Sequence, residues 1–247
     1  MYEFKFGWLA KYWPFYIEGL KNTLALAVIT VFLGAVVGTV LAMMKLSKSR
    51  IVRFFASLYI EFIRGTPLMV QVLMLHYGVF GMLFKINLPI FTSSIIVLSI
   101  NSSAYVAEII RSGIQAVPKG QMEAARSLGM RYSAAMLRII MPQAIKNILP
   151  ALGNEFVTVI KESSIMSIIG MGDLMYKANT ISGNTYLYFE PLLIVSLIYF
   201  VLTFSLSKLL GYIESRMGDS AAGRMEKADR SIMGKRLFGM GVKRENR

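Results

Sequence analysis

The chain has 247 residues, of which 55% are hydrophobic and only 17% are charged, and its net charge is +13. A soluble protein rarely contains several long apolar runs, because each run of about 20 residues is enough to cross a bilayer. The sequence has no cysteine, which excludes disulfides and thiolate metal sites, and its one histidine, His76, is expected to be a packed or interfacial residue. We therefore predict an all-α integral membrane protein without a metal site.

The predicted elements begin with residues 1–18, an aromatic-rich segment with scattered lysines that is typical of the membrane surface. Five apolar stretches follow, and each is predicted to be a transmembrane helix: residues 19–44, 54–84, 88–110, 145–169 and 188–213. In the first stretch Gly34, Gly38 and Ala42 recur every four positions, which favours close helix packing. Gly65-Thr66-Pro67 is expected to interrupt the second, either as a simple proline kink or as a broken helix that exposes backbone along a transport path.

The charges of the connecting loops predict the orientation in the membrane. If the loops alternate sides, one side receives 20 of the 27 lysines and arginines and the other receives five. The positive-inside rule places the richer side in the cytoplasm, so the N-terminus is expected outside and the C-terminus inside. This asymmetry and attraction to anionic lipids explain the net charge, and no nucleic-acid partner is required.

A polar loop, residues 117–142, separates the third and fourth predicted spans. It contains Glu123-Ala124-Ala125, then Gly129 after three residues, then Ile139-Ile140-Met141-Pro142 after a further nine. Physically the pattern predicts a short helix, a glycine turn and a second short helix, because glycine takes the left-handed conformation at low cost. Such a cytoplasmic helix hairpin is suited as a binding surface for a soluble partner; the alternative is that the segment is an ordinary loop.

This spacing resembles the EAA loop of bacterial ABC-importer permeases, with Met141 in the place of a leucine. Two further stretches are similar to segments of the polar amino-acid permeases within that group: Glu61-Phe62-Ile63-Arg64-Gly65-Thr66-Pro67-Leu68 with Gln71, and the segment from Ala104 to Ile114. The resemblance covers residues 19–215, the predicted permease domain, and leaves residues 216–247 as a basic tail. The tail is either a solvated terminus or a weak inner-leaflet anchor.

The resemblance implies the membrane permease subunit of a type I importer in the bacterial inner (plasma) membrane, with Glu123, Ala124, Ala125 and Gly129 coupling it to an ATPase. The implied partners are a cytoplasmic ABC ATPase dimer, an extracytoplasmic amino-acid-binding protein and a second permease chain, identical or homologous. The sequence has no G-x-x-x-x-G-K-[ST] phosphate loop, so ATP and Mg are expected on the ATPase, and this chain is expected to have no catalytic residues and no cofactor.

Charged residues within the predicted spans are costly in lipid and usually face an interior or an aqueous cavity. Glu61 and Arg64, and likewise Glu108 and Arg111, stand three positions apart and can pair along one helix. We expect these four residues to form ion pairs or a gate rather than to contact substrate.

A polar stripe on the fourth predicted span is formed by Asn154, Glu155, Thr158 and Glu162. Asn101, Ser102 and Tyr105 occupy a similar depth in the third. Together they predict a small polar cavity for an amino acid, and hydrogen bonding between helices is the alternative. Two other functions are possible alternatives, a membrane enzyme and a structural scaffold. Only Lys161 with Ser163 or Ser164 suggests an enzyme, and a scaffold would not need the polar residues in mid-span.

Overall fold

The structure is a computed structural model that describes the backbone of residues 4–241 and the side chains of residues 4–216, and over the described backbone all regular secondary structure is helical. The chain divides into two units, residues 1–207 and 208–247. The elements are α1 (Leu9–Lys45), α2 (Arg50–Gly65), α3 (Leu68–Leu73), η1 (Met74–Leu83), α4 (Ile90–Gln115), α5 (Lys119–Ser127), α6 (Tyr132–Ala135), η2 (Met136–Ile140), α7 (Met141–Glu162), η3 (Ser163–Ile169), α8 (Leu174–Thr185) and α9 (Phe189–Gly241).

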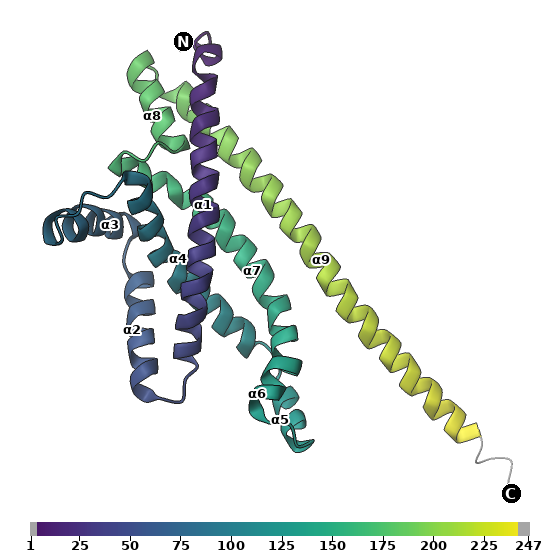
Figure 1. Cartoon of the computed structure of the whole chain (residues 1–247). Helices are drawn as coiled ribbons and strands as arrows, with labels where there is room; N and C mark the ends of the chain where they lie inside the picture. The colour runs from purple at the N-terminus through teal and green to yellow at the C-terminus, as the bar shows by residue number, and fades with distance from the viewer. Residues whose placement is uncertain (1–3, 242–247) are drawn as a thin grey trace, which may run out of the picture. The chain divides into compact units, whose positions relative to one another are not determined.

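The two ends of the first unit carry different loops. Figure 1 shows α5, α6 and the α1–α2 connection at one end, and the start of α1 with α8 at the other. The lysine- and arginine-rich loops therefore share one end, as the charge pattern predicts. Of the predicted basic tail, residues 242–247 lie outside the described part of the chain, as do residues 1–3 of the N-terminal segment.

Helix α1 packs against α2, α4, α7 and α8, and its most extensive neighbour is α4. An added Cβ at Gly38 would lie 2.8 Å from the carbonyl oxygen of Ser103, and one at Gly34 would lie 3.0 Å from Ser102 Oγ. The predicted close packing at these small residues is thus present, since any larger side chain would push α4 away.

The N-terminal segment is helical from Leu9 and continues into the first span without a break. The 37 residues of α1 extend about 55 Å at 1.5 Å per residue, well beyond the roughly 30 Å hydrocarbon core. The first turns of α1 are held because Tyr16 is buried against α8 and donates a hydrogen bond to the carbonyl of Pro191 at 3.1 Å. Gly19 lets the Cα of Leu174 approach closely.

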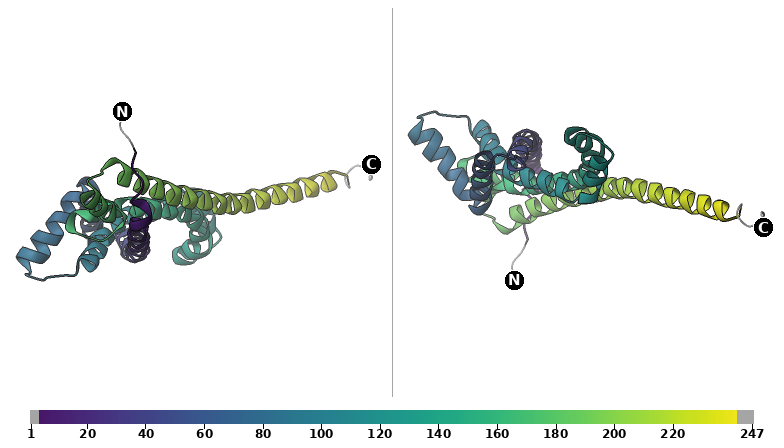
Figure 2. Two further views of the ribbon diagram at one scale, coloured as in Figure 1. Left: turned by 90° about the horizontal axis from the view of Figure 1, so that it is seen from above. Right: turned by 90° about the horizontal axis from the view of Figure 1, so that it is seen from below.

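The interruption at Gly65-Thr66-Pro67 is a sharp bend. The two helical parts, Arg50–Gly65 and Leu68–Leu83, meet at 107°, and Figure 2 shows the second part extending away from the neighbouring helices. Pro67 cannot donate to the carbonyl of Ile63. The side chain of Gln71 does so instead, with its Nε2 2.7 Å from that oxygen and 3.1 Å from the carbonyl of Thr66.

Three helical segments are long and apolar enough to cross a membrane, Leu9–Lys45, Ile90–Gln115 and Phe189–Arg216, and the bent pair makes up to four. This count covers the described residues and falls short of the five predicted spans. The predicted span at residues 145–169 falls on α7 and η3, which are not among these segments; α7 carries four charged side chains, Lys146, Glu155, Lys161 and Glu162.

The loop between α4 and α7 is a hairpin whose two arms differ. Its first arm, α5, ends in a Schellman motif: Gly129 has φ +84°, its N–H bonds to the carbonyl of Arg126, and the N–H of Met130 bonds to that of Ala125. The second arm, α6, runs through the π-helical η2 directly into α7 and is not a separate short helix. Pro142 has no N–H for the carbonyl of Arg138, and the backbone widens to π-type bonding just before it.

Candidate functional site

A buried polar contact joins α4 to α7 in the middle of the unit. Ser102 Oγ donates to Glu155 Oε1 at 2.8 Å, and the two residues are 1% and 8% exposed. Gly34 of α1 closes the other side of Ser102. The carboxyl group of Glu155 is thereby taken out of lipid and held in place by one hydroxyl, which leaves its second oxygen for another partner.

A second buried contact joins α4 to the bend after α2. Asn101 Nδ2 donates to Gln71 Oε1 at 3.0 Å, while the Nε2 of Gln71 bonds to Thr66 Oγ1 and to the backbone of the bend. Sequence reasoning quoted Gln71 only as part of a motif and did not propose it as a site residue. The signal was available, because the carbonyl that Pro67 leaves without a donor requires a partner.

The remaining residues of the predicted path lie apart from these contacts. Asn154 is exposed, Glu162 is half-buried, and Thr158 donates to the carbonyl of Asn154 at 3.1 Å within α7. Tyr105 is half-buried, with the Arg64 guanidinium 5.4 Å from its ring centroid. The structure therefore brings Ser102 to Glu155 and Asn101 to Gln71, and leaves Asn154 and Thr158 on a less covered face of α7.

Three of the four predicted charged residues, Arg64, Glu108 and Arg111, meet at the carboxylate of Glu108, and Glu61 is not part of this cluster. Glu108 contacts Lys45 Nζ at 2.6 Å, Arg111 Nη2 at 2.8 Å and Arg64 Nη1 at 3.9 Å. The Glu108–Arg111 contact is the expected pair along α4, whereas Arg64 approaches Glu108 and not Glu61. Lys45 was not proposed from the sequence, because it lies 63 positions away on α1 and only the packing of α1 on α4 brings it close.

The hairpin has a buried base and an exposed apolar tip. Ala125 is 2% exposed, while Glu123 and Ala124 are exposed, and Leu128 is 84% exposed beside the Gly129 turn. A cavity of about 500 Å³ lies against the hairpin, lined mainly by apolar side chains of α4, α5 and η2 together with Tyr132. Leu128 is the exposed apolar side chain beside the turn, and sequence reasoning did not single it out.

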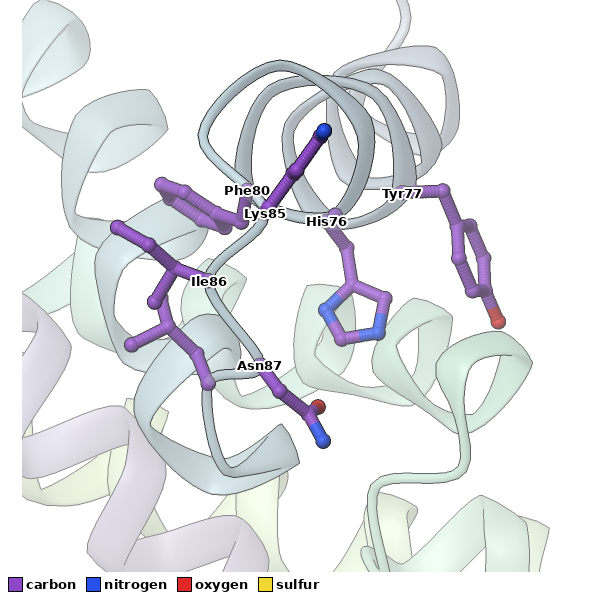
Figure 3. A pocket seen from close by; sticks show the side chains of 8 residues that line it. His76, Tyr77, Phe80, Lys85, Ile86 and Asn87 are labelled. Carbon is purple, nitrogen blue, oxygen red and sulfur yellow. The ribbon is translucent and has the colours of Figure 1, made fainter.

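A pocket of about 330 Å³ with both polar and apolar lining lies at the other end of the bent second helix (Figure 3). Its lining includes His76, Tyr77, Phe80, Lys85 and Asn87. The Nδ1 of His76 is 2.8 Å from Ser93 Oγ, so the ring is held as a packed residue at the start of α4. None of the predicted path residues lines this pocket, and the described residues contain no group of three histidine, aspartate or glutamate side chains placed to hold a metal ion.

Comparison with known proteins shows which family and which relatives this chain resembles. Residues 22–219 match the family model described as "Binding-protein-dependent transport system inner membrane component". The chain is 42% identical over 204 residues to the arginine transport system permease protein ArtQ of Bacillus subtilis, covering 83% of this chain and 93% of that protein. It is 44% identical over 213 residues to a putative glutamine transport system permease protein, GlnP, of Rickettsia prowazekii, covering 85% and 97%.

Solved structures agree. A chain from the crystal structure of an amino acid ABC transporter with histidines matches with a TM-score of 0.83 and 52% identity, over 87% of this chain and all of that one. A chain of the inward-facing MetNI methionine ABC transporter matches with a TM-score of 0.63 over 81% and 93% of the two chains. At 18% identity the second match shows the fold alone.

Proposed function

The chain belongs to the inner membrane components of binding-protein-dependent transport systems, and we propose that it imports a polar amino acid using ATP hydrolysed by a separate subunit. Relatives named for arginine and glutamine transport support this substrate class. The observation that carries the proposal is the hairpin, a rigid turn with an exposed apolar tip on a helical membrane chain that has no phosphate loop.

The proposed arrangement in the inner membrane has five spans, with α7 as the fourth. Its charged residues are tolerated in that place because α4 covers Glu155 and because a polar path needs them. The lysine- and arginine-rich end is cytoplasmic, which places the hairpin and the C-terminus inside and the N-terminus with α8 outside.

The hairpin couples the permease to its ATPase. Leu128, Glu123 and Ala124 form an exposed surface on α5, and the Schellman turn at Gly129 fixes its direction. When the ATPases close on ATP, a surface held in this way moves as one body with them and tilts the helices that follow. Alternate opening of the membrane site to each side is the result.

The proposed substrate path is built on the two buried contacts and on the open face of α7. Glu155 supplies a carboxylate for the substrate ammonium, and Asn101 with Gln71 supplies amide groups for polar atoms. Asn154, Thr158 and Glu162 continue the path along α7, and Ser102 orients the Glu155 carboxylate. The four residues Glu61, Arg64, Glu108 and Arg111 remain outside this path as ion pairs or gate residues.

The partners follow from the same proposal. A binding protein delivers the amino acid from outside, and an ABC ATPase dimer carries ATP and Mg²⁺ on the cytoplasmic side. A second permease chain completes the membrane part. This chain supplies no nucleotide-binding residue and no catalytic residue.

Site-specific crosslinking tests the coupling surface, because the chain has no cysteine of its own. Leu128→Cys in membranes that contain the cognate ATPase should crosslink to that subunit through a short reagent with a maleimide arm for the new thiol and a succinimidyl ester arm for lysine amines of the ATPase. Tyr186→Cys is the matched control, since Tyr186 is 88% exposed at the opposite end of the unit. Equal crosslinking of both positions, or none at Leu128 in a complex that still purifies intact, refutes the assignment of the hairpin.

A further inference from the structure

Two buried oxygen atoms near the start of α8 have no hydrogen-bond partner. Asp173 is fully buried as the N-cap of α8, and its Oδ1 accepts from the N–H of Tyr176 at 2.8 Å. Its Oδ2 has no partner among the described residues, and the same is true of the hydroxyl oxygen of Tyr199 on α9. Buried polar atoms are nearly always bonded to protein, water or an ion, so these two require an explanation.

The two oxygens belong to one cluster of polar groups. The hydroxyl of Tyr199 faces the side chains of Thr23 and Ser163 and lies within electrostatic range of Asp173. Thr23 on α1 and Ser163 at the start of η3 are fully buried. Thr23 Oγ1 also accepts from the N–H of Leu174, the residue after Asp173, at 3.1 Å. Four elements thus each direct one side-chain oxygen to this cluster.

The cluster lacks positive charge. Ser163 already donates its hydroxyl hydrogen to the carbonyl of Ile160 at 2.8 Å, and a carboxylate such as that of Asp173 can only accept. None of the ion pairs in the described part of the chain includes Asp173, and Lys177 on the same helix pairs with Glu18 at 2.8 Å. Because a buried carboxylate without a compensating charge is costly, the missing component is a cation.

The ligand chemistry indicates the class of this cation. Carboxylate and hydroxyl oxygens, without nitrogen or sulfur, are ligands of hard cations. One carboxylate balances one positive charge, whereas a divalent ion would bring a second, unbalanced charge into a buried site. A water molecule would not neutralise the carboxylate, and a proton on Asp173 Oδ2 can bond to only one of the other oxygens. A monovalent metal ion can neutralise the carboxylate and contact all of them.

We propose that Asp173, Tyr199, Thr23 and Ser163 bind one alkali-metal cation, sodium or potassium, which fastens the start of α8 to α1, η3 and α9. No motif reveals such a site in the sequence, because its ligands lie far apart along the chain and three of them are hydroxyl groups. None of these residues belongs to the proposed path or to the hairpin, so the site does not depend on the proposed function. In buffer without either ion, the carboxyl group is left to a proton.

The melting temperature of the purified full-length chain in detergent tests the proposal without transport. Sodium chloride or potassium chloride replaces choline chloride at constant ionic strength, because choline is too large for a buried site. At least one of the two alkali salts should raise the melting temperature saturably, by roughly 5 °C. Asp173→Asn should lose this rise, since asparagine still caps α8 but carries no charge. Glu18→Gln is the matched control: Glu18 is an exposed acid on α1, and its replacement should leave the rise unchanged.

Two results overturn the proposal and leave Asp173 Oδ2 to a proton or an ordered water. One is a native chain that melts at the same temperature in choline and in both alkali salts. The other is an Asp173→Asn chain that keeps the native rise. If Asp173→Asn does not fold, Tyr199→Phe decides instead, because the loss of one ligand should raise the half-saturating salt concentration by roughly tenfold. An unchanged half-saturating concentration in Tyr199→Phe would overturn the site as well.

Discussion

Replacing Gly129 tests the coupling hairpin through its backbone alone. Gly129 has φ +84°, and no atom lies within 4 Å of the position of an added Cβ, so a new side chain meets no obstacle. The cost of a substitution is therefore the cost of the left-handed conformation, about 1–2 kcal/mol for an ordinary residue and more for a β-branched one. Since 1.4 kcal/mol is a factor of ten, Gly129→Val should lower the population of the native turn by about tenfold or more.

The assay is ATP hydrolysis stimulated by loaded binding protein, measured in proteoliposomes that contain equal amounts of inserted permease. Gly129→Val should lose most of the stimulation, Gly129→Ala less, and Gly129→Asn least, because asparagine tolerates the left-handed region. Gly120→Val is the matched control: Gly120 lies in the first turn of α5, the helix that Gly129 ends, in equally open space and without a positive φ. Native stimulation in Gly129→Val, or equal loss in Gly120→Val, would refute the reasoning.

Three further predictions concern other parts of the chain. Glu155→Gln should weaken substrate-dependent uptake by at least tenfold. Ser102→Ala should have a smaller effect, because it removes only the hydroxyl that orients Glu155. Unchanged uptake kinetics in both variants would make the Ser102–Glu155 contact purely structural. Truncation after Met217 should preserve transport, because it removes only the last two residues of the family match, which ends at residue 219; complete loss in an assembled complex would reveal a role for the tail. Burial raises the pKa of Asp173 to about 7, against the hydrogen bond that it accepts from the N–H of Tyr176. Because the pKa of Asp173 is higher in the folded state, its carboxyl group contributes stability to the fold below about pH 4, and this contribution is lost as the pH rises through 7. The thermal stability of the chain in detergent should therefore fall over this range relative to that of Asp173→Asn. A pH-independent difference between the two chains would contradict the argument.

Sequence reasoning succeeded where one local feature determines the structure. Gly129 in a left-handed turn and the break at Gly65-Thr66-Pro67 follow from the backbone chemistry of glycine and proline. The small residues Gly34 and Gly38 on one face of α1 likewise predicted its close contact with another helix. The family resemblance, drawn from motif spacing, is confirmed by the match over residues 22–219.

The parts that sequence reasoning did not anticipate depend on contacts between distant positions. Lys45 joins Glu108 only because α1 packs on α4, and the continuation of α1 from Leu9 depends on Tyr16 and Gly19 packing against α8. Arg64 could pair with Glu61 by spacing, but tertiary packing turns it toward Glu108. The roles proposed for the path residues remain predictions, since their contacts fit both a binding cavity and helix–helix bonding.

The most direct test of the central claim is uptake by reconstituted components. Proteoliposomes containing this chain, its cognate ATPase and ATP inside, with the cognate binding protein outside, are supplied with radiolabelled polar amino acids. We expect accumulation of at least one amino acid that stops when the ATPase, the binding protein or hydrolysable ATP is omitted. Accumulation by the chain alone, or none from the complete and assembled set across the panel, would contradict the assignment as an ATP-driven amino-acid importer.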